Sequence, residues 1–239
     1  MIKFGLIGDP ISHSASPALF AKAYGGRWQY DLIEGADFEA SWRRFLNEYQ
    51  AINITAPFKE PAFCKVAEEG VLGGIPGQAG NDVIRDLAAI NIAVKEADGR
   101  IRGYNSDYLG VKMLLEQKGY GKGSTVVVAG FGGAGRAAAA AAKALGCDVL
   151  VCNRTRYTPD IRPLEELPVL SGVADILIYT LAFPIPEIKD LDCPAILEAN
   201  YRNPCLAGSP GYIPGTEWHR AQAETGYPLM TGESVSGTL

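Results

Sequence analysis

Histidine is scarce in this chain, and basic residues do not outnumber acidic ones. Two histidines and five cysteines without a Cys-x-x-Cys pair give no basis for a zinc site, so no metal is expected. The odd number of cysteines is typical of reduced thiols in a cytoplasmic protein. A net charge of −5 argues against nucleic acid or an anionic membrane as the main partner.

Long hydrophobic runs are also lacking. No apolar run approaches the roughly 20 residues that a membrane-spanning helix needs. The apolar start of the chain is too short for a signal peptide because Asp9 interrupts it, and we expect a buried first strand there. With 239 residues, of which 47% are hydrophobic, the chain has room for one large domain or two small ones.

Strand-like and helical patterns alternate along most of the chain. This alternation predicts an α/β fold with parallel strands covered by helices. We expect Ser16 to be the N-cap of a helix whose first residue is Pro17, and residues 64–80 to form a loop. The other expected strands are 3–7, 30–33, 51–55, 101–104, 125–129, 148–152, 174–180 and 195–201, and the later helices are 109–117, 135–145 and 216–225.

A glycine-rich turn stands between an apolar strand and an alanine-rich helix. The strand is expected over 125–129, and the helix follows the turn directly. Such a turn lets backbone N–H groups and a helix N-terminus approach a pyrophosphate, whereas the bland alternative is a turn kept tight for packing. Because both flanking elements are present, we predict a dinucleotide site. Its residues are Gly130, Gly132, Gly133, Ala134 and Gly135.

A basic residue follows the next expected strand. Asn153, Arg154 and Thr155 come where a site for NAD usually carries an acidic residue that binds the ribose. The guanidinium of Arg154 suits the 2′-phosphate of NADP, although a solvated turn capped by Thr155 would also explain the segment. We predict NADP as the cofactor.

A lysine and an aspartate are candidates for the proton transfer that accompanies hydride transfer. Lys59 follows a short strand and a Pro-Phe pair, and Asp107 follows Asn105 and Ser106. The residues alone leave both readings open, since Lys59 could be a surface lysine and Asp107 could only cap the next helix. Placed together, an ammonium and a carboxylate could relay a proton during ketone reduction.

Five motifs in order resemble the shikimate dehydrogenases. They extend over residues 5 to 155, which makes the resemblance far more specific than any single motif. A sixth segment, 199–204, is similar to a later Tyr-x-x-Pro segment of that family. The five motifs are residues 5–17 (Gly-Leu-Ile-Gly-Asp-Pro-Ile-Ser-His-Ser-Ala-Ser-Pro), 53–59 (Asn-Ile-Thr-Ala-Pro-Phe-Lys), 103–107 (Gly-Tyr-Asn-Ser-Asp), the glycine turn 130–135, and 153–155 (Asn-Arg-Thr).

The resemblance implies a role for each matching residue. Lys59 would be catalytic and serve the oxygen of the reacting carbon, and Asp107 would pair with it and bind a neighbouring hydroxyl. Ser14 and Ser16 would bind the substrate carboxylate, with Thr55 at the same end. Asn91 would orient the substrate hydroxyls, and Tyr201 would line the cleft from the cofactor side.

The resemblance also implies two domains with a cleft between them. Residues 1–105 would form an N-terminal α/β substrate domain, to which the tail 226–239 could return, and residues 106–225 would form a Rossmann-like NADP-binding domain. Three departures stand out: Ile92 replaces a usual threonine, residues 65–82 form a longer connection, and the closing segment diverges. In particular, we find no counterpart of the family's substrate glutamine and do not assign Gln222 to that role.

The implied activity is the reversible, NADP-dependent reduction of 3-dehydroshikimate to shikimate in the chorismate pathway of aromatic amino acid biosynthesis. Such an enzyme would be cytoplasmic, monomeric or homodimeric, and would act on a small molecule rather than on nucleic acid or a membrane. Two alternatives stay open. One is a dehydrogenase acting on quinate or a related polyol carboxylate, and the other is a catalytically weak paralogue that binds NADP or a metabolite.

Overall fold

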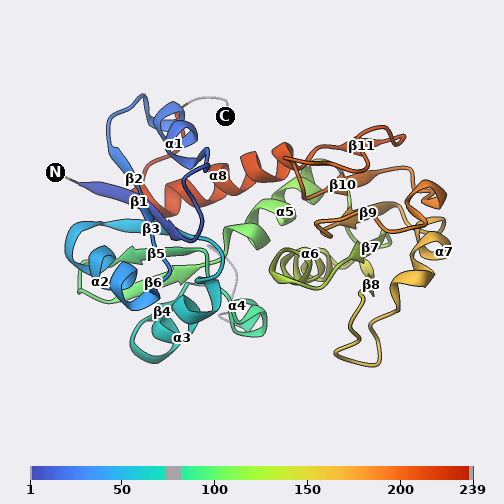
Figure 1. Cartoon of the computed structure of the whole chain (residues 1–239), viewed down its shortest axis with the longest axis horizontal. Coiled ribbons are helices and arrows are strands. Elements are labelled where there is room, and N and C mark those ends of the chain that lie inside the picture. Colours follow the sequence, from blue (N-terminus) through green and yellow to red (C-terminus); the bar gives the residue numbers. More distant parts are fainter. Residues whose placement is uncertain (1, 74–81, 237–238) are drawn as a thin grey trace. The chain divides into compact units, whose positions relative to one another are not determined.

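The computed structural model describes residues 2–73, 82–236 and 239, and it divides into two compact units (Figure 1). Unit 1 comprises Met1–Leu109 and Gln222–Leu239, and unit 2 comprises Gly110–Ala221. Helices α5 (Ser106–Gln117) and α8 (Gly215–Thr231) each contain one boundary, where the sequence led us to expect boundaries after residues 105 and 225. The predicted α/β fold class is confirmed, because each unit consists of a sheet and helices.

In the described part of unit 1 the strands form one mixed sheet in the order β2-β1-β3-β5-β6-β4. Strand β1 lies between β2 and β3 and is parallel to both, whereas β5 is antiparallel to β3 and β6. The carboxyl ends of β1 and β3 therefore lie at the same edge of the sheet. The strands are β1 Lys3–Gly8, β2 Gln29–Glu34, β3 Ala51–Ile54, β4 Val71–Leu72, β5 Ile92–Lys95 and β6 Ile101–Tyr104.

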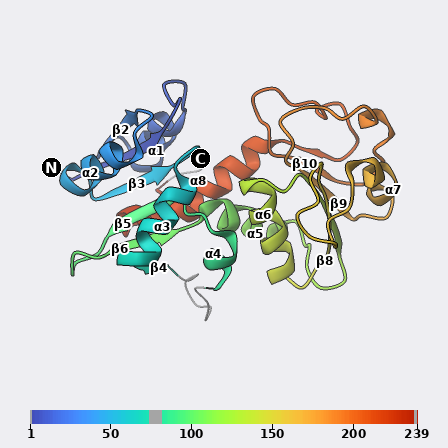
Figure 2. The same ribbon diagram turned by 60° about the horizontal axis from the view of Figure 1, so that its bottom comes forward.

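Helices cover both faces of this sheet. On one face α2 (Phe38–Glu48), α3 (Lys59–Glu69) and α4 (Asp82–Leu87) contribute to a core with Ile7, Ile52 and Ile54. Figure 2 shows α3 beside β4 and β6. On the other face α1 (Ser16–Tyr24) and the end of α8 enclose an aromatic core that includes Phe4 and Phe20.

Two local predictions in unit 1 are wrong. Ala15, not Ser16, occupies the N-cap of α1, and Ser16 is the first helical residue. The N–H of Ser16 donates to the Ser14 hydroxyl 3.2 Å away, and no side-chain oxygen caps the helix in the way that was expected of Ser16. The expected loop 64–80 begins with the helix α3, whose Ala62 and Val66 are buried one turn apart, and continues into β4. The rest of that loop, residues 74–80, lies outside the described residues.

Unit 2 has a sheet in the order β11-β10-β9-β7-β8, and all the pairs in its described part are parallel. Helix α6 packs closely on this sheet because its buried face consists of alanines, such as Ala138 and Ala141. The remaining elements are β7 Thr125–Ala129, α6 Gly133–Ala144, β8 Asp148–Cys152, α7 Leu167–Ser171, β9 Ile176–Tyr179, β10 Ile196–Glu198 and β11 Tyr212–Ile213, with 3-10 turns at Leu164–Glu166 and Ile188–Asp190.

The last helix is longer than the sequence led us to expect. Helix α8 continues past the predicted end at residue 225 to Thr231, although it contains Gly226 and Pro228. A Cβ on Gly226 would lie 2.7 Å from Ile92 Cδ1, so glycine lets the helix approach β5 closely. None of the helices in the described part of the chain is long and apolar enough to span a bilayer.

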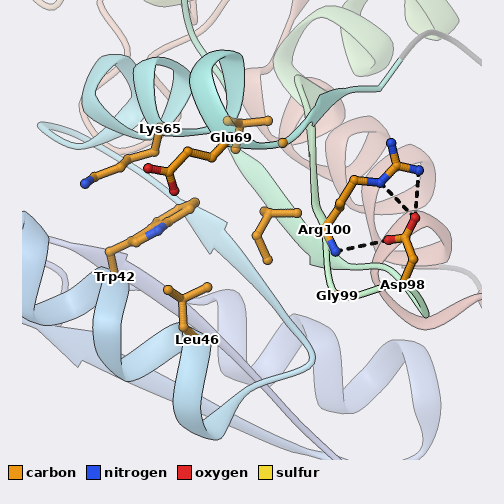
Figure 3. A pocket seen from close by; sticks show the side chains of 10 residues that line it. Trp42, Leu46, Lys65, Glu69, Asp98, Gly99 and Arg100 are labelled. Atoms are coloured by element: carbon orange, nitrogen blue, oxygen red, sulfur yellow. Dashed lines mark hydrogen bonds and ion pairs between the residues drawn. The ribbon is translucent and has the colours of Figure 1, made fainter.

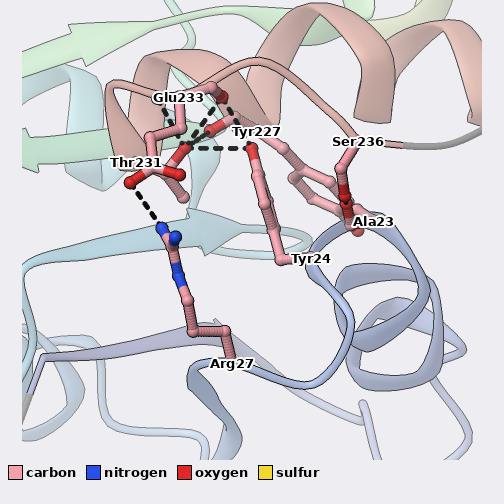
Figure 4. Close-up of polar contacts among 7 residues, drawn as sticks. All are labelled: Ala23, Tyr24, Arg27, Tyr227, Thr231, Glu233 and Ser236. Atoms are coloured by element: carbon pink, nitrogen blue, oxygen red, sulfur yellow. Dashed lines mark hydrogen bonds and ion pairs between the residues drawn. The ribbon is translucent and has the colours of Figure 1, made fainter.

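The segment after α8 is fastened to α1 (Figure 4). The Tyr24 hydroxyl hydrogen-bonds Thr231 Oγ1 at 2.9 Å and donates to the Glu233 carbonyl at 3.1 Å. Arg27 forms an ion pair with Glu233, and the Ser236 hydroxyl donates to the Ala23 carbonyl at 2.6 Å. The end of the chain therefore belongs to unit 1 and stabilises the aromatic core around α1.

Candidate active site

Lys59 is the first residue of α3, and its backbone is fixed on both sides. Before it, the N–H of Phe58 donates to the Thr55 carbonyl at 2.9 Å, and the Phe58 ring is buried in the core. The Lys59 carbonyl accepts the N–H of Ile90 at 3.2 Å. The backbone of Lys59 is thus held by a turn and by a second segment. This differs from the other interpretation of the sequence, in which Lys59 is a surface lysine.

Asp107 lies in the first turn of α5, which begins at Ser106 and not at residue 109 as expected. The side chain of Asn105 caps this helix, because its Oδ1 accepts the N–H of Tyr108 at 3.0 Å. The Asn105 amide nitrogen also donates to the Ala89 carbonyl at 3.0 Å. Asn105 provides this cap, so the carboxylate of Asp107 is available for another partner.

That partner is Lys59. The Lys59 ammonium donates to Asp107 Oδ2 at 2.6 Å, and the two side chains are 29% and 10% exposed. A charge-assisted hydrogen bond of this kind, with the carboxylate nearly buried, orients the ammonium while leaving one side of it accessible. The fold therefore brings together two residues that are far apart in the sequence. Their geometry suits an ammonium that donates a proton and a carboxylate that orients it.

Asn91 links the segments that carry this pair. Its Oδ1 accepts the N–H of Ser106 at 2.6 Å, and its backbone carbonyl accepts the N–H of Ile54 at 2.8 Å. The side chain is buried, with 6% exposure of the residue. The bond to Ser106 turns the amide so that its Nδ2 group is the donor left for a ligand.

The predicted carboxylate-binding residues lie at the carboxyl ends of β1 and β3. Thr55 directly follows β3, and its methyl group packs so close to Gly8 that a Cβ there would lie 2.4 Å away. Ser14 and Ser16 stand at the start of α1, where the Ser14 hydroxyl donates to Ser16 Oγ at 3.0 Å. Glycine at position 8 is needed for this close approach of the two strand ends.

Helix α8 supplies a residue that the sequence analysis did not assign. Gln222 lies where α8 enters unit 1, and the helix then continues through Tyr227 and Met230 into the aromatic core. Helix α8 therefore returns a glutamine to unit 1, and Gln222, to which the sequence analysis gave no role, becomes a candidate. Ala223, Tyr227 and Met230 recur at helical spacing across Gly226 and Pro228, and this periodicity was the signal that could have identified it.

In unit 2 the glycine turn has the geometry that a phosphate requires. Gly130 has a φ of +97°, Gly132 is the N-cap of α6, and Gly133 is its first residue. A Cβ on Gly132 or Gly133 would meet no atom within 4 Å, so the helix N-terminus is open on that side. Ala134 follows in the same turn, and its backbone belongs to the same group of donors.

Gly135 has a different function in the turn. A Cβ at this position would lie 2.1 Å from the carbonyl oxygen of Gly130. Gly135→Ala is therefore expected to lower the free energy of unfolding by about 1–3 kcal/mol, as overpacking does, and to weaken NADP binding. Urea unfolding of this variant and of Gly133→Ala checks the result, because the second change adds the same methyl group to open space. Equal stability of the two variants would contradict the close packing.

The turn after β8 is connected to the glycine turn. Asn153 Oδ1 accepts the N–H of Phe131 at 3.2 Å, and Asn153 Nδ2 donates to the Thr155 carbonyl at 2.7 Å. Arg154 is exposed between them, and no acidic side chain within the described ranges forms an ion pair with it. Asn153 joins the turn that carries Arg154 to the glycine turn. A phosphate bound at the glycine turn would thus have an arginine on the neighbouring turn.

Tyr201 follows β10 on a loop that unit 2 holds in place. Its ring stacks on His219 of α8, with centroids 5.1 Å apart and planes at 21°. The loop is fixed at its far end by Glu198, a fully buried residue whose carboxylate accepts the N–H groups of Cys205 and Leu206 at 2.7 and 3.0 Å. Tyr201 itself is 39% exposed, as expected of a ring that meets a ligand.

A separate hollow of about 390 Å³ lies on unit 1 (Figure 3). Its charged side chains include the ion pair of Arg100 with Asp98, and its apolar floor includes Trp42 and Leu46. None of the predicted site residues is among the described residues that line it, so it plays no part in the candidate site. The lining residues are Trp42, Leu46, Lys65, Val66, Glu69, Gly70, Asp98, Gly99, Arg100 and Ile101.

Comparison with known proteins places this geometry in a family. A model of the shikimate dehydrogenase substrate binding domain matches residues 6–69. The NADP(+) shikimate dehydrogenase of Halobacterium salinarum is 36% identical over 180 residues, which are 72% of this chain and 63% of that protein. The corresponding protein of Archaeoglobus fulgidus is 32% identical over 201 residues, which are 74% of this chain and 67% of the relative.

Solved structures agree over almost the whole chain. Shikimate 5-dehydrogenase from Thermus thermophilus, in complex with NADP(H) and shikimate, superposes with a TM-score of 0.79 at 25% identity, covering 99% of this chain and 95% of that one. Shikimate dehydrogenase from Thermotoga maritima gives a TM-score of 0.73 at 27% identity, with coverage of 95% and 93%. The sequence match and the fold together show that this chain belongs to the shikimate dehydrogenase family.

Proposed function

We propose that the protein is an NADP-dependent shikimate dehydrogenase, which interconverts 3-dehydroshikimate and shikimate. The observation that carries the proposal is the 2.6 Å ion pair between Lys59 and Asp107, formed by residues of two family motifs. The matching segment spans 63% of the Halobacterium relative, which is less than two thirds of that protein's length. The proposal therefore depends on the site residues of this chain.

The lysine and the aspartate divide the proton chemistry between them. Reduction of a ketone adds a hydride to its carbon and a proton to its oxygen, and oxidation of the alcohol reverses both steps. The Lys59 ammonium would hydrogen-bond the oxygen and give it the proton, while Asp107 holds the ammonium in line. In the reverse direction Lys59 would accept the hydroxyl proton. When bound, NADP would supply or accept the hydride.

Five short polar side chains would bind the substrate from rigid elements of unit 1. The hydroxyls of Ser14, Ser16 and Thr55 would hold the carboxylate at the carboxyl ends of β1 and β3. The Asn91 amide would donate to a ring hydroxyl, because its oxygen is already bonded to a backbone N–H. Gln222, brought by α8, would bind a further hydroxyl. Several convergent polar groups are what a small polyol carboxylate needs for orientation.

The cofactor proposal depends on the fit of unit 2 to NADP. The open N-terminus of α6 at Gly132 and Gly133 would bind the pyrophosphate, and Arg154, with Asn153 and Thr155 beside it, would bind the 2′-phosphate. The Asn153 bonds hold the two turns together, so both phosphate sites have a fixed relation.

Tyr201 would present its ring to the ligand from unit 2, where it stacks on His219. The stack and the buried Glu198 anchor fix the ring before any ligand arrives. A ring held in advance loses little conformational entropy when it contacts a ligand.

Two observations weaken the alternatives of a quinate-type enzyme and a weak paralogue. Ile92, which replaces a usual threonine, is fully buried in the aromatic core of unit 1, where Gly226 makes room for it. The substitution therefore changes packing, and its side chain does not supply a ligand group. Helix α8 carries Gln222 into unit 1, which supports a glutamine-bearing helix in this chain and weakens the paralogue reading.

The state of the cysteines supports a cytoplasmic location. All five are free thiols, and burial raises the pKa of the Cys152 thiol to about 11. A protonated, buried thiol reacts slowly with oxidants, and unpaired cysteines are typical of proteins from a reducing compartment. We therefore propose that the protein is cytoplasmic.

Initial rates with shikimate and quinate, each with NADP⁺ and NAD⁺, test the proposed function. We expect the highest kcat/KM with shikimate and NADP⁺, because Arg154 distinguishes the cofactors and the polar groups of unit 1 match one polyol. A higher rate with quinate would favour the related dehydrogenase. No turnover with any pair, alongside measurable NADP⁺ binding, would contradict the proposal and favour the paralogue.

A further inference from the structure

An arginine in the first turn of α6 has a hydrogen-bond donor without an acceptor. Arg136 is the fourth residue of this helix, and its backbone N–H donates to the carbonyl of the N-cap residue Gly132 at 2.9 Å. The Nε atom of its side chain is buried and has no hydrogen-bond partner in the described part of the chain. None of the ion pairs between described residues involves its guanidinium either. Most buried polar groups in proteins have a partner, because an unpaired one costs free energy, so this arginine requires an explanation.

The position of this arginine is also unfavourable for a cation. The N-terminus of a helix carries a partial positive charge, which acidic side chains stabilise and basic side chains destabilise. Residues 133–136, the first turn of α6, include no acidic side chain, and the N-cap glycine has no side-chain oxygen to offer. The Arg136 guanidinium therefore adds charge to an end of the helix that is already positive. Departures of this kind from the rules of local stability are expected at functional sites.

The open end of the helix lies within reach of this side chain. Side chains in an α-helix lean toward its N-terminus and cover the preceding turn. For Arg136 that turn contains Gly132 and Gly133, where an added Cβ would meet no atom within 4 Å. Arg136 as a whole is partly exposed, so a ligand at this end of the helix can reach its guanidinium. Rotation about the bonds of the side chain then lets Nε donate to the ligand as well.

We propose that Arg136 is a further cofactor-binding residue, whose guanidinium pairs with the pyrophosphate of NADP. A phosphate oxygen supplies the acceptor that the protein does not, and its negative charge offsets the positive end of the helix. The planar guanidinium also suits two parallel hydrogen bonds to one phosphate group. Arg136 and Arg154 then have different partners, because Arg154 is assigned to the 2′-phosphate. This inference depends on the proposed function, since it takes NADP as the ligand of unit 2.

Arg136→Met tests the inference, since it keeps a long, flexible stem and removes the guanidinium. We expect the dissociation constant of NADP⁺, measured by isothermal titration calorimetry, to rise about 10- to 100-fold, the range for hydrogen bonds to a charged group. The dissociation constant of NAD⁺ is expected to rise by the same factor, because both cofactors contain the pyrophosphate. Lys143→Met is the matched control, since it removes the same charge from the same face of α6 two turns later. It is expected to change neither constant by more than about twofold.

Urea unfolding separates binding from a structural role. Without cofactor, Arg136→Met is expected to unfold at the same urea concentration as the wild type or at a higher one, because it removes an unpaired buried donor and a cation from the positive end of a helix. Saturation with NADP⁺ should then raise the midpoint of the wild type more than that of the variant at equal cofactor concentration.

Three results would overturn the inference while the proposed function stands. They are a lower midpoint of Arg136→Met without cofactor, a dissociation constant for NADP⁺ within about twofold of the wild type, and a loss confined to NADP⁺, which would place the guanidinium at the 2′-phosphate. A wild-type chain that binds NADP⁺ but does not oxidise shikimate would contradict the proposed activity and leave the inference intact. A wild-type chain that does not bind NADP⁺ would contradict both.

Discussion

Lys59→Ala is expected to lower kcat for shikimate oxidation by about 100- to 10,000-fold, the usual contribution of a positioned proton donor or acceptor. The variant loses the Lys59 ammonium, whose backbone is held on both sides and whose charged partner is the Asp107 carboxylate. The proposed NADP⁺ site lies in unit 2, so the dissociation constant of NADP⁺ is expected to stay unchanged. Steady-state rates measure kcat, and isothermal titration calorimetry with NADP⁺ measures the dissociation constant.

Lys65→Ala provides a matched control for this change. Lys65 is on the same helix, its side chain is 32% exposed against 29% for Lys59, and it also pairs with a carboxylate, that of Glu39. Removing it takes away the same charge and a similar ion pair at a distance from Asp107. We expect kcat to stay within about twofold, because exposed pairs contribute little. A Lys59→Ala variant with the activity of Lys65→Ala would remove Lys59 from catalysis.

The family resemblance named Asp107 as the partner of Lys59, whereas the residues alone also allowed Asp107 to be only a helix cap. The structure decides between them because Asn105 takes the capping position. Nothing in the local pattern shows which of two adjacent polar residues caps a helix, since both have oxygens at suitable reach.

Regular alternation made unit 2 the easier half to predict. The strands β7, β8 and β9 consist mostly of apolar residues, and the turn at Gly130 stands between two unambiguous elements. Errors occurred where helices contain residues that usually end them. Helix α8 continues through Gly226 and Pro228 because tertiary packing against Ile92 and the aromatic core outweighs their low propensity.

Contacts across strands lay beyond the reach of sequence reasoning. Tyr30 was expected only as part of a strand, and its bond to Asn53 depends on the order of β2, β1 and β3 in the sheet. Strand order is set by the connections and the cores on both faces, and no short-range pattern encodes it. The bond between Tyr30 and Asn53 therefore became visible only in the structure.

Arg154→Ala is expected to raise the KM for NADP⁺ by about 10- to 100-fold, the range for hydrogen bonds to a charged group. The KM for NAD⁺ is expected to change by less than about twofold, because NAD⁺ lacks the 2′-phosphate. The guanidinium is exposed beside Asn153, whose bonds place the turn next to the phosphate-binding helix end.

Arg156→Ala is the control for this second change. Arg156 lies in the same connection, but its guanidinium donates to the carbonyls of Ile161 and Pro159 at 3.0 and 3.4 Å, so it supports the loop and is not aimed at a ligand. It carries the same charge, and its removal lowers the general electrostatic attraction of NADP⁺ equally. A selective loss of NADP⁺ binding in Arg154→Ala alone would therefore identify a local contact. An equal rise of KM for NADP⁺ and NAD⁺ would show that Arg154 does not bind the 2′-phosphate. NAD⁺ has no such phosphate, so removing a group that binds it should leave the KM for NAD⁺ unchanged.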